Sequence, residues 1–210
     1  MKFAREGYPL IFGSGVVALV LHLLAGWWAG LLALILTLFI ASFFRDPERE
    51  IPEGEGLVVS PADGRVTAID ADRSPEGAPG EKFQRVSIFM SPLNVHVNRA
   101  PEDGTVVSVK HTPGRFVAAY DERASTENER NEVVMHDPKG RTLVFVQIAG
   151  LLARRIICRL SPGDRVARGE RMGLIMFGSK VDVYLPASAR VLVRVGERVR
   201  AGSHVLGELA

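Results

Sequence analysis

Hydrophobic and polar positions divide the chain into two parts with different patterns. From Pro9 to Phe44 there is no Asp, Glu, Lys or Arg. From Leu57 onward, short runs rich in Val and Ile alternate with turn sequences such as PADG, PEDG, DPKG and SPGD. Such alternation is typical of β-strands joined by tight turns. We therefore expect a mostly β fold, a compact barrel or barrel-sandwich domain, preceded by an N-terminal hydrophobic helical membrane anchor.

The charge-free stretch is too long for one upright membrane span. As a single helix it would be roughly 54 Å long, against about 30 Å of bilayer hydrocarbon. It fits either one steeply tilted helix or two short helices that turn near residues 26–30. The apolar core of a signal peptide is normally about 7–15 residues long, so retention as an anchor is favoured over cleavage.

Positive residues lie on both sides of this stretch, with Lys2 and Arg5 before it and Arg45 and Arg49 after it. This arrangement suits a hairpin whose two flanks are cytoplasmic. We expect an anchor at 1–45, a Pro- and Gly-rich linker at 46–56 and a β-rich domain at 57–210. The predicted location is the cell membrane, with the β-rich domain on the cytoplasmic face.

A weak internal repeat supports the barrel-sandwich prediction. The segments GDRVARG at 163–169 and GERVRAG at 196–202 both have the pattern G-x-x-V-x-x-G. Glycines of this kind supply positive φ at tight turns, and the central Val is expected to pack inward. The pattern resembles the turns of lipoyl-type barrel-sandwich folds. The polar segment DERASTENERNE lacks strand character and predicts a short helix or a loop over a site.

Composition excludes several classes of protein. The formal net charge is +2 and the basic residues are dispersed, so nucleic-acid binding has no support. One cysteine, Cys158, excludes an internal disulfide framework. Since it lies in the apolar run RRIICRL, we expect it to be a buried hydrophobic residue.

Three segments contain residues that could take part in catalysis. They are SPADGRV around Asp63, SPLNVHVNRAP around His96, and FGSKVDVYLP around Ser179. Taken singly, each has a structural explanation as a turn, a core histidine or a bulge. Taken together, they supply a carboxylate, a base and a serine that follows Gly178. A serine hydroxyl becomes a good nucleophile when a histidine, oriented by a carboxylate, takes its proton.

The proposed target of Ser179 is the chain's own backbone. Attack of its hydroxyl on the carbonyl of Gly178 would give an ester by an N-to-O acyl shift. Gly178 suits this position because, without Cβ, it can adopt the strained turn that exposes its carbonyl. β-Elimination and hydrolysis would then convert Ser179 into a pyruvoyl group with loss of ammonia.

These motifs, together with FFRDPER, ENERNE and IAGLLARRI, resemble the short form of the phosphatidylserine decarboxylase family from Phe43 to the end of the chain. The resemblance implies a pro-enzyme cut between Gly178 and Ser179 into chains 1–178 and 179–210. These chains would form a heterodimer or a higher oligomer. The pyruvoyl group of Ser179 would form a Schiff base with phosphatidylserine, or with an ether-lipid analogue carrying the same headgroup. The product would be phosphatidylethanolamine, made for phospholipid biosynthesis without a metal or diffusible cofactor.

Two positions depart from longer relatives of that family. Those carry Leu-Gly-Ser-Thr at the cut, whereas this chain has Phe177-Gly178-Ser179-Lys180. They also have a second histidine three residues after the first, where this chain has Arg99 after His96. His96 is therefore expected to serve both processing and decarboxylation.

Other residues are candidates for binding the lipid headgroup, or for surface and structural roles instead. They are Asn98, Arg99, Arg115 and Arg130. Lys180 is expected to be an outward-facing strand residue.

Three alternative functions remain open from the residues alone. A barrel-sandwich metallopeptidase would need clustered ligands, and no His-x-His occurs. A Ser-Lys peptidase is disfavoured because Ser179 and Lys180 are adjacent and would point to opposite faces of a strand. A lipoyl-like carrier would need a lysine at a hairpin tip, and a pure adaptor module would show no self-cleavage.

Overall fold

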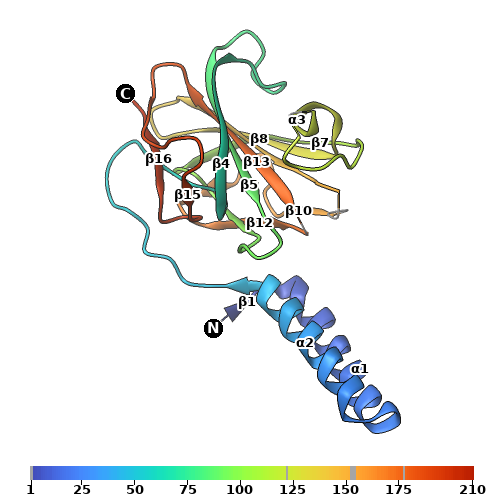
Figure 1. Ribbon diagram of the computed structural model, residues 1–210. Coiled ribbons are helices and arrows are strands. Elements are labelled where there is room, and N and C mark those ends of the chain that lie inside the picture. Colours follow the sequence, from blue (N-terminus) through green and yellow to red (C-terminus); the bar gives the residue numbers. More distant parts are fainter. Residues whose placement is uncertain (1, 122, 152–154, 177) are drawn as a thin grey trace. The chain divides into compact units, whose positions relative to one another are not determined.

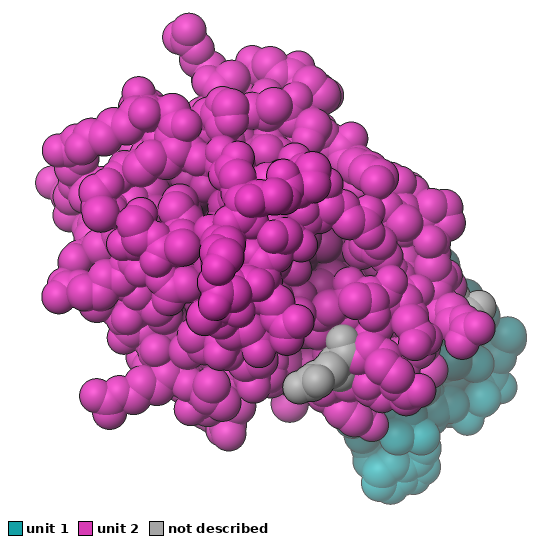
Figure 2. Space-filling view, turned by 90° about the horizontal axis from the view of Figure 1, so that it is seen from above, with its two compact units in different colours: residues 1–48 teal, residues 49–210 magenta. Residues whose placement is uncertain are grey.

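The computed structural model describes residues 2–121, 123–151, 155–176 and 178–210. The chain forms two compact units, residues 1–48 and 49–210, coloured separately in Figure 2. Each unit is described by itself.

The first unit is a helical hairpin closed by a short strand pair. It contains β1 (Lys2–Phe3), the 3-10 helix η1 (Arg5–Gly7), α1 (Tyr8–Ala25), α2 (Trp27–Phe43) and β2 (Arg45–Asp46), with β1 and β2 antiparallel. Gly26 separates the helices with φ +84°. Gly30 of α2 lies directly against His22 of α1, where a Cβ atom would come within 2.5 Å of the His22 Cβ.

The helices of this unit expose most of their large apolar side chains. Exposing such an apolar surface to water costs free energy, whereas exposing it to lipid does not. The segment Arg5–Ala25 is long and apolar enough to cross a membrane, and Trp27–Phe43 is apolar but shorter. The first unit therefore contains a candidate membrane span.

The second unit is built almost entirely of antiparallel strands (Figure 1). Its elements are β3 (Leu57–Val59), β4 (Gly64–Arg73), β5 (Phe83–Met90), β6 (Val97–Arg99), β7 (Gly104–Thr112), α3 (Ala124–Glu127), β8 (Arg130–His136), β9 (Thr142–Ile148), β10 (Ile156–Cys158), β11 (Arg165–Val166), β12 (Arg171–Ile175), β13 (Ser179–Pro186), β14 (Arg190–Val191), β15 (Arg198–Val199) and β16 (Val205–Glu208). The mostly β prediction is confirmed, and α3 is the short helix expected in the polar segment.

The main sheet has the order β11-β7-β8-β9-β13-β5-β4-β15 and is flanked by the small sheets β10-β12-β6 and β14-β16-β3. This order is symmetric about the central pair β9 and β13. At each end, a two-residue strand from one G-x-x-V-x-x-G repeat pairs with a strand that begins at an Asp-Gly turn. The fold is therefore an internal duplication.

The two turns of this duplication match in detail. Asp63 Oδ1 accepts a hydrogen bond from the Ala201 N–H at 2.8 Å, and Asp103 Oδ1 accepts one from the Arg168 N–H at 3.0 Å. The four glycines that bound the repeats all have positive φ, and the central Val of each repeat is buried, as the sequence predicts. Asp63 therefore has a structural twin in Asp103.

The core lies on both faces of the main sheet. Val181, Val183 and Leu185 of β13 pack into the larger cluster inside the curled sheet. Tyr184 packs against the smaller cluster on the opposite face, together with Phe83 and Ala124. This alternation places Ser179 on the side of the larger cluster, because side chains two residues apart share a face. Cys158 is half-buried and packs against that cluster.

Candidate active site

Ser179 is the first residue of the central strand β13, and its side chain is fully buried. Its Cα is in register with Met90, the last residue of β5, and its Oγ donates to the Met90 Sδ at 3.4 Å. Gly178 precedes it with φ +62°, in the left-handed region that favours glycine. The Gly178–Ser179 peptide is therefore the bond at which a left-handed turn enters a strand.

The carbonyl of Gly178 packs against Gly150. A Cβ atom on Gly150 would lie 2.1 Å from the Gly178 oxygen and 3.0 Å from the Ala119 Cβ. Any larger residue at this position must displace one of its neighbours. The close approach fixes the carbonyl that a nucleophile at Ser179 would attack.

Asn128 holds the segment that lies beside Gly150. Its Nδ2 donates to the carbonyls of Val117 and Ala149, each at 2.7 Å, and its Oδ1 accepts from the Val117 N–H at 2.8 Å. The side chain is fully buried. Asn128 thus ties the segment 113–121 to the end of β9, which leads into Gly150.

His96 is buried and oriented by a backbone carbonyl. Its Nδ1 lies 2.9 Å from the Asn94 oxygen. A carbonyl oxygen only accepts, so Nδ1 carries the proton and Nε2 carries the lone pair of the neutral ring. The Ile175 N–H donates to the His96 carbonyl at 3.4 Å, so three residues, 176–178, lead from this contact to Ser179.

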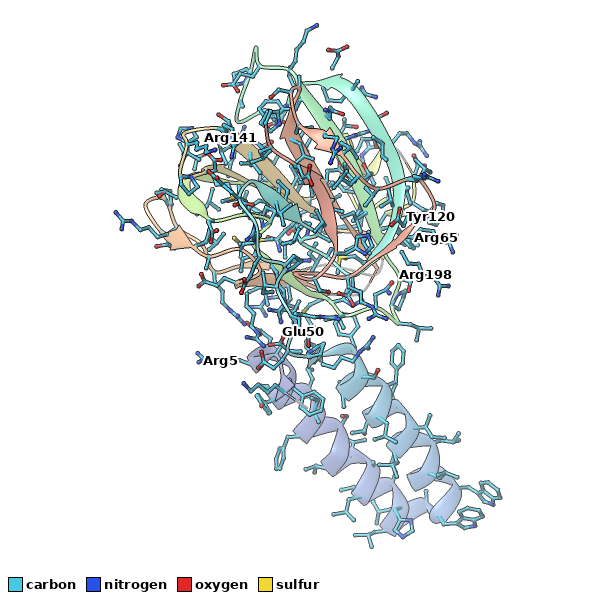
Figure 3. The ribbon with its side chains drawn as sticks, turned by 90° about the vertical axis from the view of Figure 1, so that its left-hand side faces the viewer. Arg5, Glu50, Arg65, Tyr120, Arg141 and Arg198 are labelled. Atoms are coloured by element: carbon cyan, nitrogen blue, oxygen red, sulfur yellow. The ribbon has the colours of Figure 1, made fainter. Side chains whose placement is uncertain are left out.

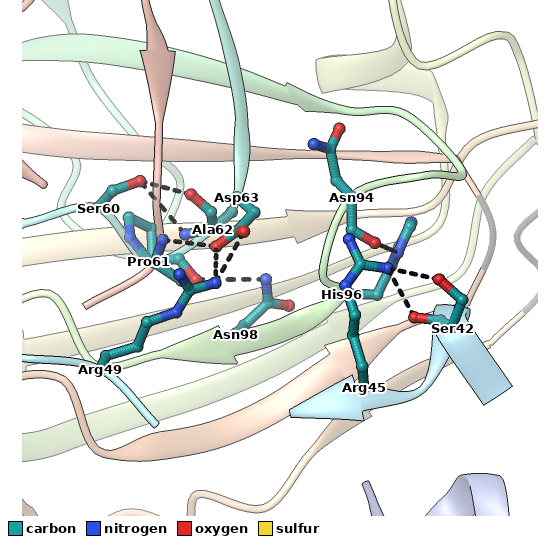
Figure 4. A network of polar contacts seen from close by, with 11 residues as sticks. Ser42, Arg45, Arg49, Ser60, Pro61, Ala62, Asp63, Asn94, His96 and Asn98 are labelled. Atoms are coloured by element: carbon teal, nitrogen blue, oxygen red, sulfur yellow. Dashed lines mark hydrogen bonds and ion pairs between the residues drawn. The ribbon is translucent and has the colours of Figure 1, made fainter. Parts of the chain in front are cut away.

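Asp63 makes a different set of contacts from the one expected. Its carboxylate accepts from the Arg49 Nη2 at 2.8 and 3.0 Å and from the Ala201 N–H, and the orienting position on His96 Nδ1 belongs to Asn94 (Figure 4). Asp63 connects to the strand after His96 through its own turn. There the Pro61 carbonyl accepts from the Arg99 N–H at 2.9 Å.

A buried polar chain runs inward from Met90. Asn98 Nδ2 lies 3.8 Å from the Met90 Sδ, and Gln147 Nε2 donates to the Asn98 Oδ1 at 2.9 Å. Gln147 also accepts from Asn131 at 3.3 Å. Since the amides satisfy one another, the interior beside Ser179 can be polar without a large desolvation penalty.

The arginines expected to bind a headgroup lie apart from one another. Arg99 is buried and donates to the Gly169 carbonyl at 2.8 Å. Arg115 is 81% exposed and faces Glu127 at 3.6 Å, while Arg130 pairs with Glu76. The structure does not gather these three side chains into one site.

Lys180 is not an outward-facing residue, so that expectation is wrong. It is 4% exposed, and its Nζ donates to Ser125 Oγ at 2.5 Å, which in turn donates to Asp182 Oδ2 at 2.8 Å. The helix α3 covers this part of the strand, which periodicity alone does not reveal. Lys180 and Ser179 do lie on opposite faces, as predicted.

The buried charges behind β13 shift neighbouring pKa values. Burial raises the pKa of Tyr184 to about 12, and the charge of Asp182 adds to this. Burial also acts to raise the pKa of Asp70, but the hydrogen bond and charge of Arg85 outweigh it and lower that pKa.

Among the residues with described positions, no group of three or more His, Cys, Asp or Glu side chains is arranged to hold a metal ion.

Sequence reasoning missed three arginines, Arg65, Arg198 and Arg200. They line a cleft of about 970 Å³ beside Asp63 and Phe89. The signal that could have identified them is the alternation around the buried Val199, which places Arg198 and Arg200 on the same side of their strand.

Comparison with known proteins decides the family. The family model for phosphatidylserine decarboxylase matches residues 36–207. The chain is 45% identical over 207 residues to the phosphatidylserine decarboxylase proenzyme of Cupriavidus metallidurans, covering 98% of this chain and 94% of that protein. It is 47% identical to the proenzyme of Syntrophus aciditrophicus, covering 97% and 96%.

The chain belongs to the phosphatidylserine decarboxylase family. A third relative, the phosphatidylserine decarboxylase proenzyme of Ralstonia nicotianae, is 47% identical over 206 residues, with 98% and 95% coverage. The match extends over both the candidate membrane span and the β unit of this decarboxylase family member. It favours none of the alternatives drawn from the sequence.

Proposed function

We propose that this pro-enzyme cleaves itself between Gly178 and Ser179, converts Ser179 into a pyruvoyl group and decarboxylates phosphatidylserine to phosphatidylethanolamine. The observation that carries the proposal is the Gly178–Ser179 peptide. A glycine with left-handed φ directly precedes a buried serine at the start of a central strand, in a chain of this family.

Cleavage begins with attack of Ser179 Oγ on the carbonyl carbon of Gly178. The new C–O bond replaces the peptide C–N bond, and the proton that the Ser179 hydroxyl loses is transferred to the nitrogen of residue 179, which becomes a free amine. Loss of the Ser179 Cα proton then breaks the Cβ–Oγ bond, which releases Gly178 as a carboxylate and leaves dehydroalanine. Water replaces the nitrogen as ammonia and gives the pyruvoyl group.

His96 is the base in this proposal. Its Nδ1–H is held by the Asn94 carbonyl, which leaves Nε2 as the proton acceptor of the neutral ring. With Arg99 at the position where longer relatives have a second histidine, the same Nε2 would return a proton to the substrate carbon after loss of carbon dioxide.

Asp63 supports His96 through the backbone. Its contacts with Arg49 and Ala201 fix the turn that carries Pro61. The Pro61 carbonyl in turn receives the Arg99 N–H and the Asn98 Nδ2, on the strand directly after His96. We propose that Asp63 holds this strand in place during both reactions, with Asn98 and Arg99 as its partners. Headgroup binding by Arg115 and Arg130 stays a prediction.

The residues around Ser179 fit a pyruvoyl group at the new chain end. Residues 180–184 of β13 are in register with both β5 and β9, so the backbone after the cut stays fixed without the peptide bond. Such a group supplies a ketone for the substrate amine and an electron sink for decarboxylation. Chain 179–210 would remain with chain 1–178 as a heterodimer for the same reason.

The proposed location is the cytoplasmic face of the cell membrane, with the apolar helices as the anchor. The substrate is a bilayer lipid whose headgroup stays at the interface, so anchoring keeps the enzyme where its substrate is. The flanking positive charges favour the cytoplasmic orientation.

Intact-mass analysis of purified protein tests the cleavage. We expect two chains separated after Gly178, the smaller one blocked at its N-terminus. A Ser179→Ala variant should remain one inactive chain. Ser87→Ala is the matched control, because Ser87 is also buried in the sheet and its hydroxyl has no hydrogen-bond partner among the described residues. Active protein with an unmodified Ser179 would refute the proposal.

A further inference from the structure

A cleft of about 970 Å³ opens beside β5 in the second unit. Its lining combines the guanidinium groups of Arg65, Arg198 and Arg200 with the apolar side chains of Phe89 and Leu93. Leu93 is 71% exposed. A cleft lined by arginines next to exposed apolar side chains is suited to a ligand that has both an anionic and an apolar part.

The three arginines are not neutralised by the protein. Within the described residues, none of their guanidinium groups forms an ion pair or a hydrogen bond. Asp63, the carboxylate in the cleft, is already paired with Arg49 at 2.8 Å. His204 faces Glu197 at 3.1 Å. The cleft therefore carries positive charge that an anion can neutralise.

Strand register places this charge two strands from the cut, on the face of the sheet opposite to the Ser179 side chain. Arg198 pairs with Arg65, Arg65 pairs with Phe89, and Phe89 pairs with Lys180, so the four residues form one row across the sheet. Neighbouring strands lie about 4.8 Å apart, so Arg65 is roughly 10 Å from the strand that starts at Ser179. Figure 3 shows Arg65 and Arg198 at the same edge as Tyr120.

The apolar side chains of the cleft also continue toward the scissile peptide. The Phe89 ring meets Tyr120 edge to face, with centroids 6.3 Å apart. Tyr120 is 76% exposed and directly follows Ala119, the residue beside Gly150. One exposed aromatic surface therefore connects the arginine cleft with the segment that packs on the Gly178 carbonyl.

The internal duplication supplies a comparison within the same molecule. The twin cleft, about 370 Å³, is lined by Thr105 where the first has Arg65 and by His136 where the first has Phe89. Of the three arginine positions, it keeps Arg165 alone, and Ala167 stands where the first repeat has Arg200. Because the fold forms the twin cleft without these arginines, we take their presence in the first cleft to reflect a ligand rather than folding.

We propose that Arg65, Arg198 and Arg200 bind the phosphate diester of the lipid headgroup, with Phe89 and Leu93 beside its glycerol and first acyl carbons. This inference rests on the proposed function, since it names the headgroup site for that reaction. Guanidinium groups are suited to phosphate because they present paired N–H donors in a fixed plane.

Steady-state kinetics of processed enzyme in mixed micelles tests the site. Arg65→Gln, Arg198→Gln, Arg200→Gln and the triple variant are compared with Arg165→Gln, the exposed twin of Arg198. Since the three residues are exposed and unpaired within the described chain, their replacement should leave folding intact. We expect the triple variant to raise KM for phosphatidylserine about tenfold or more with little change in kcat, and Arg165→Gln to leave KM unchanged.

Soluble competitors distinguish a headgroup site from a general phosphate site. Glycerophosphoserine should inhibit wild-type enzyme competitively and the triple variant about tenfold more weakly. Equal inhibition by inorganic phosphate would overturn the headgroup assignment. So would a KM in the triple variant within twofold of wild type, or an equal rise in Arg165→Gln.

Mass analysis of each variant separates the two proposals. Cleaved, pyruvoyl-bearing variants with unchanged KM would refute the arginine site and leave the proposed function standing. A wild-type chain that is never cleaved would refute the proposed function itself.

Discussion

The carbonyl oxygen of Gly178 lies 2.1 Å from the place where a Cβ atom on Gly150 would stand. The carbonyl that Ser179 would attack therefore packs directly against Gly150, which holds it in position. The contact joins two segments far apart in sequence, and Asn128 fixes one of them from behind. Four predictions follow from this arrangement and from the duplicated turns.

Replacing Gly150 by Ala should slow self-cleavage strongly. The added methyl group must displace the Gly178 carbonyl, and misplacement of a reacting group by about 1 Å can cost about 100-fold in rate. The measurement is the time course of conversion from one chain to two after synthesis. Gly15→Ala is the control, because nothing lies within 4 Å of a Cβ at that position. Normal cleavage of Gly150→Ala would show that the carbonyl is not held there.

Replacing Asn128 by Ala should destabilise the β unit and loosen the segment 113–121. Three hydrogen bonds are lost, and the partly buried backbone groups of Val117 and the buried carbonyl of Ala149 lose their partner, at a cost of about 2–4 kcal/mol in the free energy of unfolding. Urea unfolding and limited proteolysis measure the two effects. Thr126→Ala, which removes an exposed hydrogen bond to Arg123, should change neither measurably.

The twin aspartates separate a structural role from a functional one. Asp63→Asn and Asp103→Asn each weaken a hydrogen bond to a backbone N–H, at a cost of about 1–2 kcal/mol in the free energy of unfolding. Asp63→Asn also loses the ion pair with Arg49 and should therefore cost more. Only Asp63→Asn should slow cleavage, because only its turn supports the strand after His96. Since Asp63 acts by positioning, the pH profile of cleavage should keep its midpoint while its amplitude falls. A shifted midpoint would instead indicate direct coupling to the titrating base.

Glu102 should make the protein less stable as pH rises from 4.5 to 7. Burial raises its pKa to about 7, and the nearby charge of Arg168 offsets this only in part. In that window the folded state keeps a proton that the unfolded state has already lost, so the free energy of unfolding falls with rising pH. The total effect is on the order of 3 kcal/mol. Above pH 7 both states are ionised and the loss is constant.

Glu102→Gln should remove this slope and raise stability at pH 8. Chemical unfolding of the detergent-solubilised protein at several pH values measures it. The exposed Glu53→Gln variant should retain the wild-type slope. An unchanged slope in Glu102→Gln would place the titration elsewhere, for example at Glu132, whose pKa burial also raises.

Local patterns in the sequence determined the fold class and the candidate chemistry. The charge-free stretch, the Val-rich runs and the glycines of the two repeats each act through neighbours in the chain, so the mostly β class and the positive φ values follow from composition and spacing. The order of Asp63, His96 and Gly178–Ser179 along the chain likewise suggests self-cleavage from sequence alone.

Tertiary structure decided the partners of these residues. Asp63 binds Arg49 and Ala201, Lys180 is covered by α3, and the carbonyl of Gly178 packs on Gly150. Arg65 and Arg198 face one cleft because two strands far apart in sequence are in register. Such pairings depend on sheet order and on which face is covered, and alternation along a single strand carries no information about either.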